Sequence, residues 1–191
     1  MKIPSTLLII LTFVLLTGSH CKKNKPVDPI TQLPPETQTG ANTFGCLING
    51  QVFKPGGAQL SGGSLQCTYQ FLGSGLNGGF HFRLVGVNDN SSNRRSIGIF
   101  TDSLEVSQGG TYNLRIAHVK SGAYGLYSFS TTQPLSRDDY ETTDISTGVL
   151  NIKKLDLVNQ IMSGTFWFDA VNLNGQKVEI REGRFDVRYT Q

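Results

Sequence analysis

Few side chains in this sequence of 191 residues have the type and spacing that chemistry requires. His81 and His118 are candidate general bases, but no G-x-S-x-G nucleophile elbow accompanies them and no motif places an Asp or Ser beside either. Residues 73–78 spell G-x-G-x-x-G, yet strand-like alternation follows them, where a nucleotide-binding loop needs a helix N-terminus. The sequence therefore predicts neither an enzyme nor a bound cofactor.

Four carboxylates lie close together in the sequence: Asp138, Asp139, Glu141 and Asp144. Hard cations such as Ca²⁺ take several carboxylate oxygens, so this group is the best candidate for a metal site. Its spacing matches no calcium-binding loop, and the histidines and cysteines show no zinc-ligand spacing. We therefore expect a solvated acidic loop and no metal.

Three aromatic residues are candidates for contact with a ligand or partner. Trp167 lies between Phe166 and Phe168, and in a strand it would point to the face opposite both phenylalanines. We expect it to pack in a strand that is buried on both sides; the alternative is an exposed ring that stacks on a sugar or a partner. Tyr124 and Tyr127 could line an edge or a cavity, although most such tyrosines only cap a core.

The first twenty residues have the pattern of an export signal. After Lys2, the apolar run Leu7–Leu16 is too short to span a bilayer and is typical of a signal-peptide core. Small residues then precede Cys21, and this arrangement resembles the lipobox of bacterial lipoproteins, with Gly18 and His20 in place of the usual residues. The resemblance implies that Cys21 is acylated and holds the chain to a membrane. The alternative is cleavage by the general signal peptidase, which would leave Cys21 unmodified.

Residues 22–39 contain four of the seven prolines and no periodic apolar pattern. Such a segment predicts an extended spacer that could hold a domain up to roughly 55 Å from its anchor. Lys22, Lys23 and Lys25 lie beside the anchor, where they could touch anionic headgroups. The rest of the chain is almost neutral, so we expect no nucleic-acid partner.

Cys46 and Cys67 remain once Cys21 is assigned to the anchor. Export implies an oxidising compartment, where such a pair predicts a disulfide that would contribute roughly 3 kcal/mol by closing the intervening loop. The alternative is two buried thiols in neighbouring strands.

From Gly40 onward the sequence has the pattern of a chain of strands. It is rich in glycine, and apolar residues alternate with polar ones, as in Phe80–Leu84 and Tyr112–Ile116, without helical periodicity. The sequence predicts an all-β fold, an antiparallel β-sandwich of about ten strands or, alternatively, a closed lipocalin-like β-barrel. The strands are expected near 43–48, 51–54, 65–72, 79–87, 95–101, 111–119, 123–130, 147–155, 160–172 and 176–189.

Two local features of these strands involve glycine. Asn49-Gly50 and Asn174-Gly175 each predict a tight hairpin, because both residues of such a pair tolerate the positive φ of a type I′ turn. The apolar residues of the last strand change phase, which predicts a bulge at Glu182-Gly183 with Gly183 in the left-handed conformation.

The two ends of this region resemble a known family. Residues 39–57 (TGANTFGCLINGQVFKPGG) and residues 148–189, with their Ser-Gly-Thr-Phe segment and Gly-Arg-Phe-Asp-Val run, are similar to small lipoproteins of Bacteroidota that carry a C-terminal domain of unknown function. The resemblance implies an acyl anchor and a β-domain in the periplasm or at the cell surface. It implies no activity and no catalytic residue.

We therefore divide the chain into a signal peptide at 1–20, a lipidated Cys21 with a proline-rich tether at 21–39, and a β-sandwich domain at 40–191. We expect an outer-membrane lipoprotein of the cell envelope, facing the periplasm or the cell surface, that is a non-enzymatic binding or structural module. Its partners would be the membrane, through Cys21, and an unidentified protein, glycan or small ligand. The alternative is a carrier that holds a small apolar ligand inside a β-barrel.

Overall fold

The computed structural model describes residues 27–57, 63–73, 78–90 and 92–191 of the chain. The predicted signal peptide, Cys21 and residues 22–26 of the tether lie outside the described residues, as does most of the G-x-G-x-x-G segment. The helix found in these ranges is a single 3-10 turn, η1 (Pro29–Gln32). None of the described residues belongs to a helix long and apolar enough to cross a membrane.

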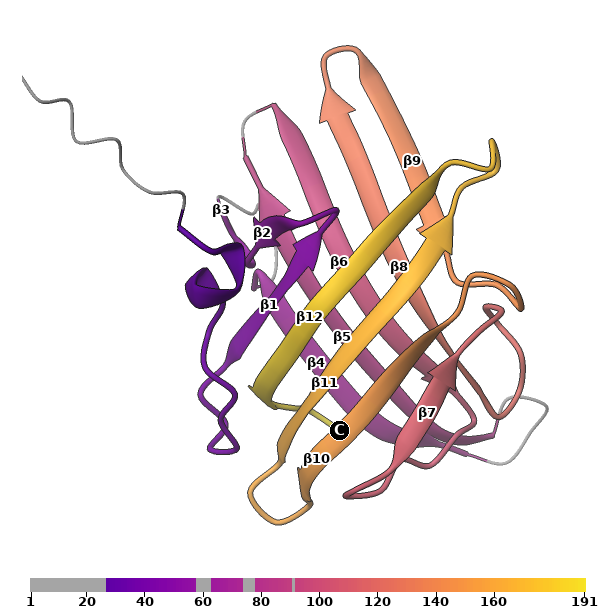
Figure 1. The fold of residues 1–191 in the computed structure, drawn as a ribbon. Helices are drawn as coiled ribbons and strands as arrows, with labels where there is room; N and C mark the ends of the chain where they lie inside the picture. Colours follow the sequence, from indigo (N-terminus) through magenta and orange to yellow (C-terminus); the bar gives the residue numbers. More distant parts are fainter. Residues whose placement is uncertain (1–26, 58–62, 74–77, 91) are drawn as a thin grey trace, which may run out of the picture.

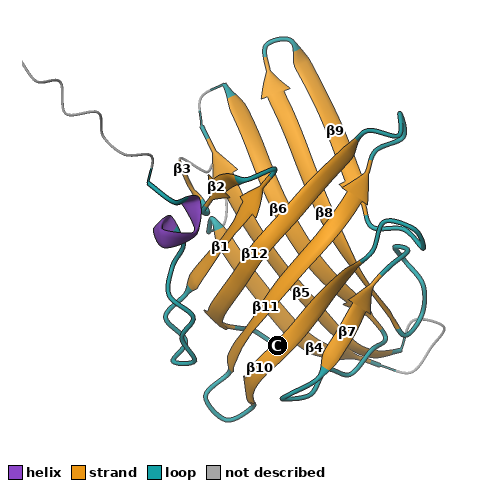
Figure 2. Cartoon of the chain, in the orientation of Figure 1, coloured by secondary structure: helices purple, strands orange, loops and turns teal. Residues whose placement is uncertain are grey.

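The described part of the domain contains twelve strands, and Figure 2 shows that the fold is built almost entirely from them. Ten correspond to strands expected from the sequence, whereas β3 and β9 are not expected. The strands are β1 (Thr43–Ile48), β2 (Gln51–Phe53), β3 (Gly56–Gly57), β4 (Leu65–Leu72), β5 (Gly79–Asp89), β6 (Asn93–Asp102), β7 (Thr111–Leu114), β8 (Gly122–Thr132), β9 (Leu135–Glu141), β10 (Gly148–Asp156), β11 (Ile161–Val171) and β12 (Lys177–Arg188).

The strands form one mixed sheet that folds over on itself into two layers. Its order is β2-β1-β12-β11-β10-β7-β8-β6-β5-β3, with β4 paired to β5 and β9 paired to β8 and, at one residue pair, to β11. In Figure 1, β1, β12, β11 and β10 lie in front and cross the direction of β4, β5, β6, β8 and β9 behind them. We call these sets the front layer and the back layer. The predicted all-β sandwich is confirmed, and the sheet does not close into a clean barrel.

Apolar side chains from the two layers meet between them, because alternate residues of each strand point inward. The ring of Phe185 on β12 lies 6.2 Å from that of Phe82 on β5 and 6.5 Å from that of Phe166 on β11, centroid to centroid. Burying one such side chain contributes roughly 1.5–3 kcal/mol to stability. These side chains belong to one continuous cluster of buried residues between the layers.

The Asn49-Gly50 hairpin between β1 and β2 is confirmed. Both residues have positive φ, 48° and 79° respectively, as a type I′ turn requires. The type I′ turn expected at Asn174-Gly175 is wrong: Gly175 has positive φ (75°) but Asn174 does not, and residues 172–176 form a longer loop between β11 and β12.

A bulge on β12 keeps its apolar residues on one face, as the phase change predicts. Gly183 pairs with Phe166 and Ile180 with Phe168, so β12 carries one residue more than β11 over this stretch. The residue with positive φ is Glu182, at 55°, and the expectation that it would be Gly183 is wrong. Gly183 is needed for space, because a Cβ atom there would lie 2.5 Å from the ring and the backbone oxygen of Phe166.

The predicted disulfide is not formed: Cys46 and Cys67 are free thiols, and both are buried in the core. Cys46 lies on β1 opposite Phe53, whereas Cys67 lies on β4 opposite Leu84 of β5. Because β1 and β4 are not neighbours in the sheet, strand pairing does not bring the two cysteines together. Burial raises the pKa of both thiols well above the ordinary value, so they remain protonated.

The end of the predicted tether packs on the front layer, which corrects the expectation that it extends away from the domain. Leu33 is buried, and Pro34 lies so close to Gly45 of β1 that a Cβ atom there would be 2.6 Å from its ring. Lys153 of β10 forms an ion pair with Glu36. The folded part of the chain therefore begins before residue 40.

Asp186 of β12 fastens this segment to the sheet. It points outward but is fully buried beneath residues 37–41. Its carboxylate accepts hydrogen bonds from Thr37 Oγ1, Thr39 N, Thr39 Oγ1, Gly40 N and Ala41 N, at 2.7–3.2 Å. Burial opposes ionisation of Asp186, but these hydrogen bonds outweigh it and hold the pKa below its ordinary value.

Candidate ligand-binding site

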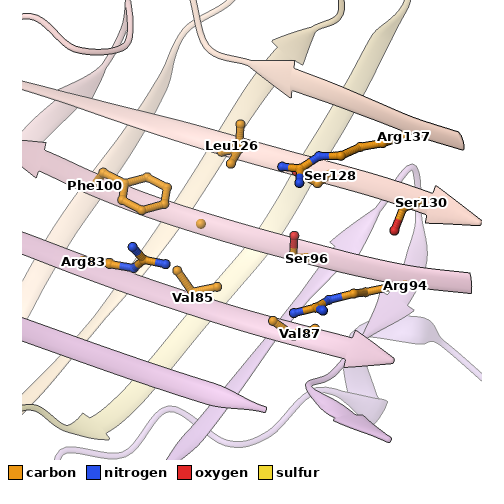
Figure 3. Close-up of a pocket in the computed structure, with 11 residues that line it drawn as sticks. Arg83, Val85, Val87, Arg94, Ser96, Phe100, Leu126, Ser128, Ser130 and Arg137 are labelled. Carbon is orange, nitrogen blue, oxygen red and sulfur yellow. The ribbon is translucent and has the colours of Figure 1, made fainter. Parts of the chain in front are cut away.

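The outer face of the back layer carries a groove that crosses four strands. The residues that alternate with the core residues of these strands point outward and form its floor and walls. The groove has a volume of about 340 Å³. Its lining is Arg83, Val85 and Val87 of β5, Arg94, Ser96, Gly98 and Phe100 of β6, Leu126, Ser128 and Ser130 of β8, and Arg137 of β9 (Figure 3).

The strand register gives this groove two basic ends. Ser130 lies opposite Arg94 on one side and opposite Arg137 on the other, so two arginines flank one serine. Arg83 lies opposite Phe100, which is six residues along β6 from Arg94, or roughly 20 Å of strand. In Figure 3 the three arginine side chains run toward the middle of the groove. We call the two groups the Arg94–Arg137 end and the Arg83 end.

The Arg83 end is held by aromatic contacts. The Arg83 guanidinium carbon lies 5.6 Å from the centroid of the Phe100 ring, within cation–π range. Phe100 in turn stacks on Tyr124 of β8, with centroids 4.9 Å apart and an interplanar angle of 17°. The Phe100 ring also extends over Gly98, where a Cβ atom would lie 2.4 Å from it. Glycine at this position therefore lets the ring of Phe100, and the Arg83 side chain that contacts it, pack close to the surface of the sheet.

The Arg94–Arg137 end is organised by one carboxylate. Arg137 Nε donates to both carboxylate oxygens of Asp139, each at 2.9 Å. The Ser128 hydroxyl donates to the same carboxylate from β8. Asp139 thereby fixes two side chains of the groove wall and leaves the terminal nitrogens of Arg137 available to a ligand.

Arg83 and Arg94 take part in no ion pair with any residue that the structure describes. Asp89 lies opposite Arg94 in the β5–β6 ladder without forming one. Both side chains are exposed, so water hydrates their guanidinium groups. The groove consequently presents more positive than negative charge to solvent.

The composition of the groove lining suits the binding of an anion. Guanidinium groups bind carboxylate, sulfate and phosphate through paired hydrogen bonds, and serine hydroxyls add donors. Among the described residues, the lining contains no histidine, cysteine or carboxylate. The residues present therefore fit recognition of a charged ligand.

Trp167 lies on the outer face of the front layer, so the expectation that it packs in a strand buried on both sides is wrong. Its side chain is 40% exposed, whereas Phe166 and Phe168 are buried in the core. The Arg181 guanidinium carbon lies 5.5 Å from the centroid of the Trp167 ring. The outer face of the front layer is exposed to solvent here. The alternation of apolar residues in a single strand cannot show whether its second face is covered.

The structure does not bring the three aromatic candidates together. Trp167 is on the outside of the front layer and Tyr124 on the outside of the back layer. Tyr127 points into the core, where it is 8% exposed and its ring lies 5.5 Å from that of Tyr140. Of the three, Tyr124 alone adjoins the groove, as the support of Phe100.

The acidic group is divided between a strand and a loop. Asp138, Asp139 and Glu141 lie on β9, where Asp138 points to the opposite side from the other two, and Asp144 lies beyond its end. Asp139 is paired with Arg137, and Asp144 forms an ion pair with Arg115 at 2.8 Å. Within the described ranges, no three side chains of the types that ligate metals come together.

The two histidines occupy separate positions near one end of the back layer. His81 Nδ1 lies 3.5 Å from a carboxylate oxygen of Asp102 on the neighbouring strand. The ring of His118 lies 5.1 Å from that of Tyr124. Each is therefore engaged with a neighbour, and neither lines the groove.

Sequence reasoning missed the arginines of the groove. Arg83 lies between two core residues and Arg94 lies between Asn93 and Arg95, so each looks like an ordinary solvent-facing side chain in its strand taken singly. Arg137 lies on β9, which is not expected to be a strand because its residues are almost all polar and exposed. The available signal was the excess of outward arginines on consecutive strands, which becomes meaningful only once the pairing is known.

A family model described as a domain of unknown function, DUF6252, matches residues 90–187, which is just over half of the chain. The chain therefore belongs to the DUF6252 family. No curated protein and no solved structure matches it. The matched region runs through β6 to β12 and includes the Arg94–Arg137 end of the groove, whereas Arg83 precedes it.

Proposed function

We propose that this protein is a lipid-anchored module of the cell envelope that binds an anionic ligand in the arginine groove of its back layer. The observation that carries the proposal is the convergence of three arginines, from three strands, on one groove. Two of them have no ion pair among the described residues, so a ligand does not have to displace an internal partner. Binding without catalysis is consistent with the chemistry of the lining.

The anchor in this proposal rests on the sequence. An apolar run that is too short to span a bilayer ends shortly before Cys21, and acylation of that cysteine would attach the chain to a membrane. The likeness to small Bacteroidota lipoproteins supports the same assignment and an outer-membrane location, facing the periplasm or the cell surface. Metabolic labelling with a fatty-acid analogue tests it: wild type should be labelled, and Cys21→Ser should not.

Titration of the full-length protein with inorganic sulfate and with galacturonate, followed by amide chemical shifts, tests the binding site. We expect shifts at Arg94, Ser130 and Arg137. The double variant Arg83→Gln/Arg94→Gln should lose about 1.5–3 kcal/mol of binding free energy, the amount typical of hydrogen bonds to charged groups.

The matched control is Lys177→Gln/Arg181→Gln, which removes the same charge from the opposite face, where both cations already pair with Asp169. This control should bind both anions as wild type does. Equal losses in the two double variants would mean that net charge, and not the groove, attracts the anions.

A further inference from the structure

We infer that the ligand of the arginine groove is a segment of an acidic polysaccharide that carries at least two anionic groups, one for each end of the groove. This inference rests on the proposed function and narrows it to a class of ligand. It is argued from the spacing of the arginines and from the side chains that lie between them.

The spacing of the basic ends requires more than one anionic group. Arg83 and Arg94 lie on adjacent strands, at positions that are six residues apart in register, or roughly 20 Å along the sheet. Their side chains approach each other across the groove but start from opposite ends of it. A single carboxylate or sulfate can occupy only one end, whereas an elongated ligand with two separated charges can occupy both.

The floor between the two ends is uncharged. It presents the hydroxyl of Ser96 and the oxygen of Ser128, whose proton is donated to Asp139, beside the aliphatic side chains of Val85, Leu126 and the mostly buried Val87. A sugar ring has the matching composition, because its C–H face packs on aliphatic groups and its hydroxyls exchange hydrogen bonds with serine. A polyphosphate or a nucleic-acid backbone carries charge along its whole length and would leave charge unpaired over this floor.

The groove gives an acidic peptide little to bind. Peptides that lie on sheets gain most of their affinity from backbone hydrogen bonds at a free strand edge. Here the groove lies on the face of the sheet, where β5, β6, β8 and β9 are paired side by side. A bound peptide would therefore find side chains alone, and its own backbone groups would stay unpaired.

The test uses the full-length protein and galacturonic acid as the monomer, the dimer and longer oligomers, with affinity measured by calorimetry. Affinity should rise steeply at the length that first spans both ends, by on the order of a hundredfold over the monomer, because the second contact is intramolecular. Methyl-esterified oligomers of the same length, which lack the charge, should bind no better than background.

Two variants locate the effect. Arg83→Gln and Arg94→Gln should each remove the length dependence and leave long oligomers binding like the monomer, while Arg184→Gln on the front layer should leave it unchanged. Arg83→Lys, which keeps the charge, should restore a large part of the dependence of affinity on oligomer length.

A glutamate oligomer and linear polyphosphate are the competing ligands, and both should bind at least tenfold more weakly than galacturonate of matched charge.

The outcomes separate this inference from the proposed function. If the monomer and sulfate bind at the groove but affinity does not grow with length, or if polyphosphate or the glutamate oligomer binds more tightly, the polysaccharide inference is wrong and the anion site stands. If no anion changes the amide chemical shifts of the groove residues, both the polysaccharide inference and the proposed anion site are wrong.

Discussion

The outer faces of the two layers differ in how their cations are paired. On the front layer, Lys177 and Arg181 both contact Asp169, and Arg184 contacts Glu182. On the back layer, Arg83 and Arg94 have no such partner among the described residues. Exposed ion pairs contribute little to stability, so the pairing matters mainly because it decides which cations are available to a ligand. A cation count taken from the sequence does not show this difference in pairing.

The largest effect on stability is expected from Asp186, the carboxylate that holds the N-terminal segment on the front layer. Asp186→Asn should lower the free energy of unfolding by about 2–4 kcal/mol, because several hydrogen bonds to a buried charged acceptor are weakened together. Asp169→Asn, on the same face but in partly exposed ion pairs, should cost less, about 1 kcal/mol. Urea denaturation of both variants measures the difference, and equal losses would refute the special role of Asp186.

The same carboxylate makes stability depend on pH. Burial alone would raise its pKa, but the hydrogen bonds from residues 37–41 lower it overall. Because the folded-state pKa lies below the unfolded one, the stabilisation is complete above the ordinary carboxyl value of 3.8 and is lost as the pH falls through the folded-state pKa. Wild type should therefore lose stability more steeply than Asp186→Asn below that value.

An intermediate effect, on ligand binding, is expected at Gly98, where a larger side chain would collide with the ring of Phe100. Gly98→Ala would push a methyl group into the Phe100 ring and displace the support of Arg83. Binding of long galacturonate oligomers should weaken several-fold, while sulfate binding at the Arg94–Arg137 end should not change. Gly56→Ala is the control, because a Cβ atom there meets nothing within 4 Å. Unchanged oligomer binding in Gly98→Ala would show that Phe100 does not position Arg83.

The smallest effect is expected at Trp167. Because the ring is 40% exposed on the front layer, Trp167→Leu should change the free energy of unfolding by less than about 1 kcal/mol and leave anion binding intact. As Trp167 is the single tryptophan of the chain, acrylamide should quench its fluorescence readily in the native state. Protection from quenching would mean that another molecule covers the front layer in solution.

The strands that the sequence located best are those in which apolar residues point inward at every second position. The expected ranges for β1 and β4 agree with the structure to the residue. β9 could not be found in this way, because it lies at the edge and its residues are nearly all exposed, so period-two alternation is lost. The groove could not be predicted for a related reason. Arg83, Arg94 and Arg137 become neighbours only when β5, β6, β8 and β9 pair, and the periodicity of a single strand does not show which strands pair.

The packed N-terminal segment determines how such a domain would sit above a bilayer. For a chain acylated at Cys21, residues 22–28 are all that separate the lipid from η1, and seven residues can span about 25 Å at most. That short distance would limit both the rotation of the domain and its height above the bilayer. It would also bring the side of the molecule that carries residues 33–41 nearest to the headgroups. The arginine groove, on the far side, would then open toward the aqueous phase, so whatever it captures would be retained within one domain's thickness of the membrane.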